Sequence, residues 1–456
     1  MNKTKTAAQR QTEGSEPVVL TRAEHSISRR DIDPDALKVL YRLYRNGFKA
    51  YLVGGAVRDL LVGRKPKDFD VVTDAHPGQV KKLFSNCLLI GRRFRLAHIR
   101  FKGGKVIEVA TFRKEPEAVL EQEPQMPASP EQEPAEEQGR EEDLHARHAH
   151  ADHNNSFGTP REDAFRRDLT INALFYDIAD FSIIDYVGGL EDIAARRVCV
   201  IGNPHERYVE DPVRMWRVLR HASRLGFSVE EETARAIVQD RGLLCSCSGA
   251  RLFEELNKDL LSGYLGPVFE ALHTYGVLAS LFGKIGQVLQ DVPGAWEGLR
   301  RNLDLVDAHA QSGKPFAPET VLTLLFWPWA AGVLGEGMRE GRDVHDILHD
   351  EIQASGMVIT VPKAMRAGIV QTLSIVERMF IAMKTSRMRW SLKKRTHYKD
   401  ASMIFPLLYK GEVLDIPDPF GRLFRDEHPS SSGPWNKKRP RWRGRRRRRG
   451  PAAGKE

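Results

Sequence analysis

Apolar positions in the first quarter of the chain alternate between a helical period and short extended runs. A helix is predicted between Asp33 and Asn46, because leucines recur there at helical spacing after an acidic first turn. A second, shorter helix is predicted over residues 56–62. Short apolar runs predict strands at 50–53, 69–73, 88–90, 97–101 and 106–112. This pattern is typical of a small mixed α/β sheet domain.

A long stretch without apolar periodicity interrupts this domain. Residues 115–155 are rich in Glu, Pro, Gln and Ala, so a disordered insertion is predicted. Order resumes at Arg161, with a helix predicted at 170–174 and a strand at 183–186. From Asp211 onward the pattern is helical to about residue 420. The second half of the chain is therefore predicted to be all-α.

Length and composition exclude several classes of protein. The 456 residues suffice for two to four domains, and a hydrophobic content of 41% is ordinary for a globular protein. No run approaches the roughly 18 apolar residues of a membrane helix. The N-terminus lacks the apolar segment of a secretory signal, so we expect a cytoplasmic protein without membrane contact. Four cysteines do not form a disulfide framework, and reduced thiols are expected.

Charge is distributed unevenly along the chain. Residues 115–143 carry eleven acidic side chains against the single Arg140, whereas residues 437–449 carry ten Lys and Arg and no acid. The two segments cancel, so the rest of the chain retains a formal charge of +9. A basic body with a basic tail indicates a polyanionic partner.

Four histidines stand near the end of the acidic insertion, at His145, His148, His150 and His153. Their spacing within an unstructured segment is a weak signal for a metal site. We interpret them as part of a solvated loop.

A glycine-rich turn joins the first predicted strand to the short helix. Its residues are Gly54, Gly55 and, one helical turn later, Arg58. Glycines allow a closer backbone approach to a ligand than any Cβ would, and a helix N-terminus offers unpaired N–H groups to a phosphate. Because such turns are common, the turn by itself does not establish phosphate binding.

Two acids come next in the chain, in Asp68-Phe69-Asp70. Strand alternation puts Asp68 and Asp70 on one face and turns Phe69 into the core. Carboxylates on one face repel one another unless a cation lies between them, and hard oxygen ligands suit Mg²⁺. Glu108, inside the apolar run 106–112, is placed to be a third acid on a neighbouring strand. The alternative is a Glu108 that points to solvent from the open face of the sheet.

The order of these motifs resembles the class II nucleotidyltransferases, the superfamily of bacterial poly(A) polymerases and CCA-adding tRNA nucleotidyltransferases. Five blocks match at appropriate distances and cover about residues 20–265. They are GG-x-x-RD at 54–59, D-x-D at 68–70, RRDLTINA at 166–173, EDP-x-R at 210–214 and AR-x-x-EE at 250–255.

The resemblance implies a role for each matching residue. Asp68 and Asp70 would bind two catalytic Mg²⁺ ions, with Mn²⁺ as an alternative, and Glu108 would complete the acidic set. Gly54, Gly55 and Arg58 would face the triphosphate of ATP. The ribose and phosphates would be addressed by Arg167, Asp168 and Asn172, and the base edge by Asp211 and Arg214.

Two segments point to the poly(A) polymerase branch of the superfamily. The sequence GRRFRLAH at 91–98 and the lead HSISR at 25–29 resemble that branch, whereas CCA-adding enzymes usually differ at both places. RNA contact is expected from Arg92, Arg93 and Arg95, because guanidinium groups neutralise phosphates. In the tail it is expected from Lys437, Lys438, Arg439, Arg441 and Arg443, with tryptophans interleaved to stack on bases.

The expected activity is template-independent addition of AMP from ATP to RNA 3′ ends, with release of pyrophosphate. CCA addition to tRNA is one alternative. A non-catalytic RNA-binding protein of the same fold is another, although it would have no reason to retain three mutually repelling acids.

The resemblance also implies an α+β architecture, with an N-terminal mixed α/β nucleotidyltransferase head domain followed by all-α neck, body and arm regions. A flexible lead (1–25) would precede the head (26–190, with the disordered insertion 115–155). A helical neck (191–265) would bind nucleotide and RNA, and a helical C-terminal region (266–425) would bind RNA. A disordered basic tail (426–456) would end the chain, and a monomer is expected.

Overall fold

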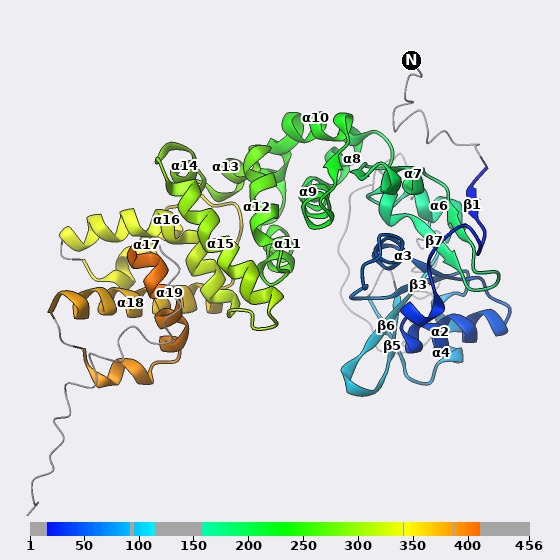
Figure 1. The fold of residues 1–456 in the computed structure, drawn as a ribbon, viewed down its shortest axis with the longest axis horizontal. Helices are drawn as coiled ribbons and strands as arrows, with labels where there is room; N and C mark the ends of the chain where they lie inside the picture. The colour runs from blue at the N-terminus through cyan, green and yellow to red at the C-terminus, as the bar shows by residue number, and fades with distance from the viewer. Residues whose placement is uncertain (1–15, 92–94, 115–156, 341, 386–387, 411–456) are drawn as a thin grey trace, which may run out of the picture. The chain divides into compact units, whose positions relative to one another are not determined.

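The computed structural model describes residues 16–91, 95–114, 157–340, 342–385 and 388–410 (Figure 1). The chain separates into two compact units, residues 1–374 and 375–456. The predicted insertion 115–155, its four histidines and the tail 426–456 all lie outside the described residues.

A mixed sheet forms the N-terminal part of the first unit. Among the described residues it has eight strands, in the order β1-β8-β7-β2-β3-β6-β5-β4. Its neighbours pair antiparallel, except that β3 and β6 run parallel. The strands are β1 Val18–Leu20, β2 Ala50–Val53, β3 Asp70–Thr73, β4 Cys87–Ile90, β5 Leu96–Arg100, β6 Val106–Thr111, β7 Leu174–Asp177 and β8 Ile183–Asp185.

Both faces of this sheet are covered by apolar side chains. On one face, α2 (Pro34–Arg45) and α4 (Pro77–Leu83) pack over a core that includes Val71, Ile107 and Val109. On the other face, a smaller cluster joins Val53, Val72 and Phe175 to Ala164 of α6 (Pro160–Phe165). Because side chains alternate along a strand, residues 70 and 108 point to this second face.

The predicted helix between Asp33 and Asn46 is confirmed. The Asp33 side chain accepts hydrogen bonds from the N–H groups of Asp35 and Ala36 and so starts α2, and Asn46 ends it. The short helix α3 spans Gly55–Leu61, one residue earlier than predicted.

Two predictions for this domain are wrong. Residues 170–172 form a single 3₁₀ turn, and Leu174, expected to end a helix, begins β7. This strand lies between β2 and β8 and is buried on both faces, so its sequence lacks the alternation that reveals a strand. The lead 1–25 is also not wholly unstructured, since Val18–Leu20 pairs with β8.

The two ends of the segment 115–156 are held together at the sheet. Arg113 and Phe157 form an isolated antiparallel bridge, and the Gly158 N–H donates to the Phe112 carbonyl at 2.9 Å. A Cβ on Gly158 would lie 2.6 Å from the Arg113 carbonyl carbon, so glycine permits this close approach.

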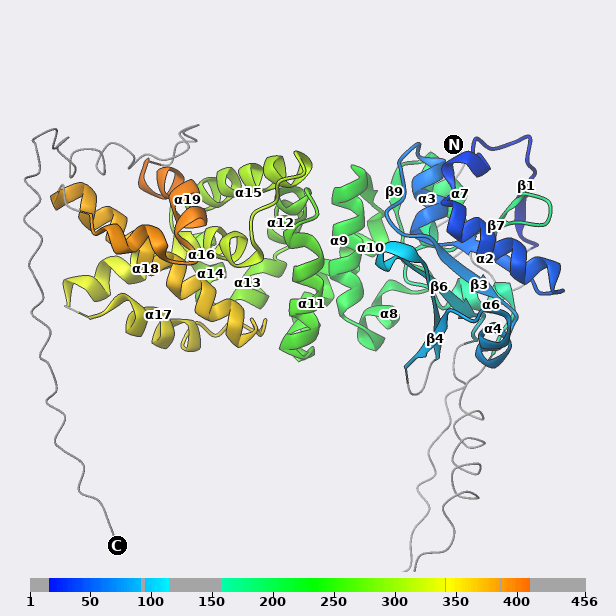
Figure 2. The ribbon, with the colours of Figure 1, turned by 90° about the horizontal axis from the view of Figure 1, so that it is seen from below.

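Helices dominate the rest of the first unit, as predicted. They are α7 Gly189–Ala194, α8 Pro204–Glu210, α9 Val213–Leu225, α10 Glu231–Asp240, α11 Gly249–Leu260, α12 Leu265–Thr274, α13 Val277–Phe282, α14 Lys284–Asp291, α15 Ala295–Gln311, α16 Pro318–Arg339 and α17 Val344–Gln353. The exception is a two-residue parallel pairing of Ser228–Val229 with Arg197–Val198. Helix α9 lies between the sheet domain and α11 (Figures 1 and 2).

In the second unit, the last part of the helix α18 (Lys363–Thr385) is followed by a 3₁₀ helix, η5 (Trp390–Lys394), and by α19 (Tyr398–Lys410). The rings of Phe380 and Phe405 pack with their centroids 4.9 Å apart. In the described part of the chain, no helix is both long and apolar enough to cross a membrane. The four cysteines are free, as expected.

Candidate active site

Three acids meet at one end of the second sheet face. Asp70 is the first residue of β3, and the parallel register of Val71 with Val109 places Asp70 beside Glu108 of β6. Asp68 lies two residues before Asp70, and the intervening Phe69 packs against the core, as alternation predicts. Partial burial raises the pKa of Asp70 to about 6, and the negative charges of Glu108 and Asp68 add to this effect.

The carboxylates are not arranged as a closed metal cage. Asp68 and Asp70 are accessible to solvent, and Glu108 contacts His98 of β5, whose Nε2 lies 3.4 Å from its carboxylate. Within the described ranges, no group of three or more His, Cys, Asp and Glu side chains forms a metal site. The donor set nevertheless fits a divalent cation, because mutual repulsion raises the pKa of Asp70 and a bound cation would relieve that repulsion.

The glycine turn lies next to these acids. Gly54 caps α3 with φ +73° and ψ −139°, a conformation that is essentially restricted to glycine. A Cβ on Gly54 would lie 3.7 Å from Nη1 of Arg167. The charge of Arg167 in turn counteracts the rise in the pKa of Asp70. The glycine turn, the Arg167 guanidinium and the three acids therefore surround one region.

Arg58 is not placed as predicted. Its side chain is buried, and its guanidinium donates to the Asp59 carboxylate from Nε at 2.9 Å and from Nη2 at 2.6 Å. Its Nη1 donates to the Asn172 side-chain oxygen and lies 3.3 Å from Nδ1 of His221. Because the Arg58 guanidinium is buried and hydrogen-bonded to Asp59 and Asn172, it holds the Asn172 side chain and does not face an open phosphate site.

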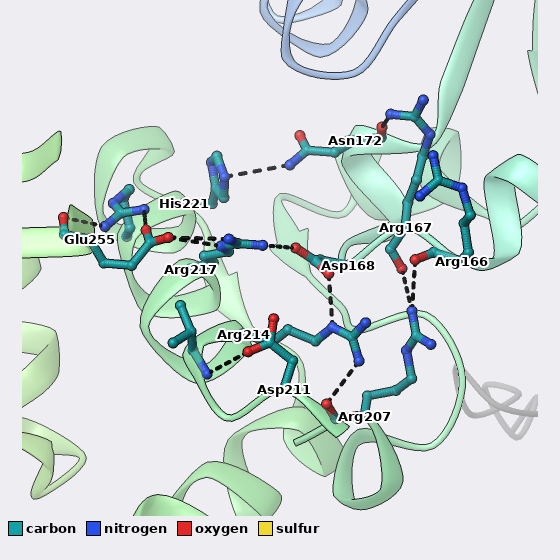
Figure 3. A network of polar contacts seen from close by, with 12 residues as sticks. Arg166, Arg167, Asp168, Asn172, Arg207, Asp211, Arg214, Arg217, His221 and Glu255 are labelled. Atoms are coloured by element: carbon teal, nitrogen blue, oxygen red, sulfur yellow. Dashed lines mark hydrogen bonds and ion pairs between the residues drawn. The ribbon is translucent and has the colours of Figure 1, made fainter. Parts of the chain in front are cut away.

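Asp168 connects the sheet domain to α9 (Figure 3). Its carboxylate accepts from Nε of Arg214 at 2.8 Å and from Nη1 of Arg217 at 2.6 Å. Burial alone would raise the pKa of Asp168, but Arg217 and Arg214 lower it below its ordinary value. Arg207 holds the same turn from α8, since its Nη2 donates to the carbonyls of Arg166 and Arg167 at 2.9 and 3.1 Å.

Asp211 and Arg214 both belong to this network, but each has its own partners. Asp211 accepts from Nη2 of Arg251 at 2.6 Å. Arg214 donates from Nη1 to Glu210 at 2.7 Å and to the Arg207 carbonyl at 2.9 Å, besides its bond to Asp168. Arg251 was not predicted as a site residue, although it stands in the AR-x-x-EE block.

A cleft of about 480 Å³ opens beside the network. Its lining includes the acids Asp68, Asp168 and Asp259, the rings of His221 and Tyr264, and the cations Lys67, Arg217, Arg220, Arg224 and Lys258. Burial and the charges of Arg58, Arg220, Arg224 and Arg217 hold the pKa of His221 well below its usual range, so its imidazole is neutral at pH 7. The cleft joins an acid of the D-x-D motif to a strongly basic surface of suitable size for a nucleotide.

Of the cationic residues of α9, the sequence analysis named Arg214 and missed the others. Their signal was present, because Arg214, Arg217, Arg220 and Arg224 recur every three or four residues and so share one helix face. Carboxylates of α11 pair with two of these arginines, Arg217 and Arg220. Glu255 pairs with Arg217 at 3.2 Å and with Arg220; burial would raise its pKa, but these cations and Lys258 lower it to about 2.

The predicted RNA-binding residues fall mostly outside the described part of the chain. Arg92 and Arg93 lie there, as do Lys437, Lys438, Arg439, Arg441 and Arg443 of the tail. Arg95 is described and is exposed just before β5.

Comparisons with known proteins agree with this geometry. Residues 50–199 match the family described as Poly A polymerase head domain, and residues 226–286 match "Probable RNA and SrmB-binding site of polymerase A". Poly(A) polymerase I of Escherichia coli O6:H1 is 47% identical over 267 residues, which are 59% of this chain and 54% of that protein. A CCA-adding enzyme of Bacillus pumilus is 35% identical over 256 residues, 56% of this chain and 57% of that protein. The chain thus spans little more than half the length of these relatives.

Solved structures share the fold. A tRNA-processing enzyme with CTP superposes with a TM-score of 0.54 at 22% identity, over 85% of this chain and 90% of that one. The resemblance predicted from the ordered motifs is confirmed: residues 50–199 match the poly(A) polymerase head domain, and the chain is similar to both a poly(A) polymerase and a CCA-adding enzyme.

Proposed function

We propose that the protein is a polynucleotide adenylyltransferase, which adds AMP from ATP to RNA 3′ ends and releases pyrophosphate. The observation that carries the proposal is the meeting of the acids Asp68, Asp70 and Glu108 with the basic cleft. The acids supply ligands for divalent cations, and the cleft supplies charge for a triphosphate. The 47% identity to a poly(A) polymerase supports adenylate addition in particular.

The acids hold the reacting groups in this proposal. Asp68 and Asp70, with Glu108 beside them, would bind two Mg²⁺ ions, with Mn²⁺ as an alternative. Bound there, the ions activate the RNA 3′-hydroxyl and stabilise the pyrophosphate leaving group. No side chain of the protein has to act as a nucleophile.

The glycine turn and the cations around it would bind the triphosphate. The backbone at Gly54 and Gly55 can approach a phosphate closely. Arg167 donates to Asp163 from Nε at 3.1 Å and from Nη2 at 2.8 Å, whereas its Nη1 makes only a long hydrogen bond, of 3.5 Å, to the Asn172 carbonyl. Arg58 would act indirectly, by fixing Asn172 for the ribose. The neutral His221 accepts or donates a hydrogen bond without adding charge.

Asp211 and Arg214 would choose the base. Each is held by a separate ion pair, to Arg251 and to Asp168, so neither rotates freely to suit another nucleotide. A rigid set of donors and acceptors discriminates between bases because a mismatched edge leaves buried polar groups unpaired.

An extension assay tests the proposal. The protein is incubated with Mg²⁺, an unstructured RNA and each of the four nucleotides in turn, and the products are sized on a denaturing gel. Long tracts from ATP alone are the expected result. CTP use restricted to tRNA lacking its terminus would indicate CCA addition instead. RNA binding without extension under any nucleotide would indicate a non-catalytic protein and would overturn the proposal.

A further inference from the structure

The second unit carries a cleft that the proposed chemistry does not use. It measures about 360 Å³ and is formed by the end of α18 and the segment around η5. Arg378, Arg389 and Arg395 line it, and all three are exposed. Within the described part of the chain, none of these guanidinium groups forms an ion pair. Three cations around one cleft repel one another unless an anion lies among them.

The rest of the cleft is apolar. Met388 and Leu392 are buried along its wall, and Ile381 is 43% exposed. A free phosphate ion would use the guanidinium groups but has no need of this apolar surface. A ligand with both an anionic and a flat apolar part would use the whole cleft.

An exposed tryptophan lies in the sequence between two residues that line the cleft, Arg389 and Ser391. Trp390 begins η5, directly after Arg389, and is 60% exposed, an unusual state for the largest apolar side chain. The ammonium group of Lys393 lies 5.6 Å from the centroid of its ring. Exposed aromatic rings among cations are typical of proteins that bind single-stranded nucleic acid, because unpaired bases stack on the rings while cations follow the backbone.

We propose that this cleft and Trp390 form a binding subsite for single-stranded RNA, in which the guanidinium groups take phosphates and the apolar surface takes a base. This inference rests on the proposed function in one respect, namely that the RNA bound at the subsite is the strand to which nucleotides are added. A duplex fits less well, because its bases are already stacked. An acidic peptide would pair with the arginines but would offer no base to stack on the exposed ring of Trp390.

The test measures RNA affinity separately from nucleotide addition. Fluorescence anisotropy follows the full chain binding to labelled oligo(A) of 6 to 30 nucleotides at several salt concentrations. The variants are Arg378→Gln, Arg389→Gln and Arg395→Gln, singly and combined, with Trp390→Ala and Trp390→Phe. Arg301→Gln is the charge-matched control, since Arg301 is exposed on α15 and does not line the cleft.

The two kinds of variant should differ in their salt dependence. The triple variant should bind long oligo(A) about tenfold or more weakly, with the slope of log affinity against log salt reduced by about two, because phosphate contacts are lost. Trp390→Ala should weaken binding about fivefold with an unchanged slope, and Trp390→Phe should restore most of it. The length at which these losses begin reports where the subsite lies along the strand. The turnover number at saturating RNA should not change.

Unchanged affinity at every length, or an equal loss in Arg301→Gln, would overturn the subsite. So would a polyglutamate peptide that binds as tightly as RNA and loses affinity equally in the triple variant, because the partner would then be an acidic protein. If the triple variant has a lowered melting temperature, the single variants and Trp390→Phe still test the subsite in folded protein. Wild-type protein that binds RNA through these residues but never extends it would refute the proposed function and leave the subsite standing.

Discussion

At the scale of single residues, Asp70 is the most informative position. It lies beside two other carboxylates, and burial together with their negative charges raises its pKa to about 6. We expect Asp70→Asn to lower the rate of RNA extension by roughly 10³-fold or more, because a cation ligand is lost. RNA affinity measured by anisotropy should remain within about twofold. Asp291→Asn, at an exposed position on α14, is the matched control and should retain full activity.

The raised pKa of Asp70 also predicts a change in stability with pH. A carboxyl whose pKa is higher in the folded state favours folding at low pH, and this contribution is lost as pH rises through about 6. Without divalent metal, Asp70→Asn should therefore raise the melting temperature at pH 7.5 by about 2 °C, and should change it little at pH 4. Added Mg²⁺ should stabilise the wild type and not the variant. Equal effects at both pH values would contradict this account of the three acids.

At the scale of elements, the strand-to-helix turn before α3 depends on one glycine. Gly54 has a backbone conformation that costs other residues about 1–3 kcal/mol, and a Cβ there would contact Arg167. We expect Gly54→Ala to raise the KM for ATP about tenfold and to lower the melting temperature. Gly63→Ala is the control, since Gly63 also has positive φ but has open space around its Cβ position. It should lower stability without affecting the KM for ATP.

A substitution of Arg214 tests the proposed role of α9 in selecting the nucleotide. The Arg214 guanidinium connects Asp168, Glu210 and the Arg207 carbonyl, so its removal would free the part of the helix proposed to contact the base. Arg214→Ala should lower the preference for ATP over CTP by about tenfold and should weaken RNA affinity less. Competition between the two labelled nucleotides measures the ratio. An unchanged ratio would remove Arg214 from base selection.

Elements with an unambiguous period were predictable from the sequence, and those defined by tertiary contacts were not. The helix α2 has an acidic N-cap and leucines on one face, and strands β2 to β6 are short apolar runs with turn residues between them, so each was found within a residue or two. Strand β7 was missed because burial on both faces removes its alternation. The lead strand β1 is three residues long and exists only by pairing with β8.

The site was predictable where residue types carry the chemistry. Strand alternation placed Asp68 and Asp70 on one face, and the position of Glu108 inside an apolar run made it a candidate third acid on a neighbouring strand. The burial of Arg58 could not be predicted, because it depends on Asp59, Asn172 and His221, the last of which comes from a helix 163 residues further along the chain.

At the scale of the whole first unit, a chain of ion pairs ties the sheet domain to the helices α9 and α11. It runs from Asp168 through Arg217 to Glu255 and on to Arg220 and Asp259. Glu255 is buried, and its pKa of about 2 means that its charge stabilises the folded state at pH values above about 4.5. Glu255→Gln should cost about 3 kcal/mol at pH 7, because the buried guanidinium of Arg220 and the partly buried guanidinium of Arg217 each lose one of their two carboxylate partners.

Chemical denaturation at several pH values measures this effect. The difference between Glu255→Gln and wild type should shrink as the pH falls from 5 toward 2, since the wild-type carboxyl becomes protonated over that range. Glu254→Gln, the exposed neighbour on α11, should show little effect at any pH. A loss that does not vary with pH would mean that Glu255 acts through packing alone.

The bridge between Arg113 and Phe157 has a consequence for how this protein can be engineered. Because the chain leaves the sheet and returns to it at adjacent positions, new termini could be opened between them, or a reporter domain grafted there, without separating β6 from its neighbours. Glu108 lies only five residues before Arg113, so a fluorescent module placed there would stand close in sequence to the proposed cation site.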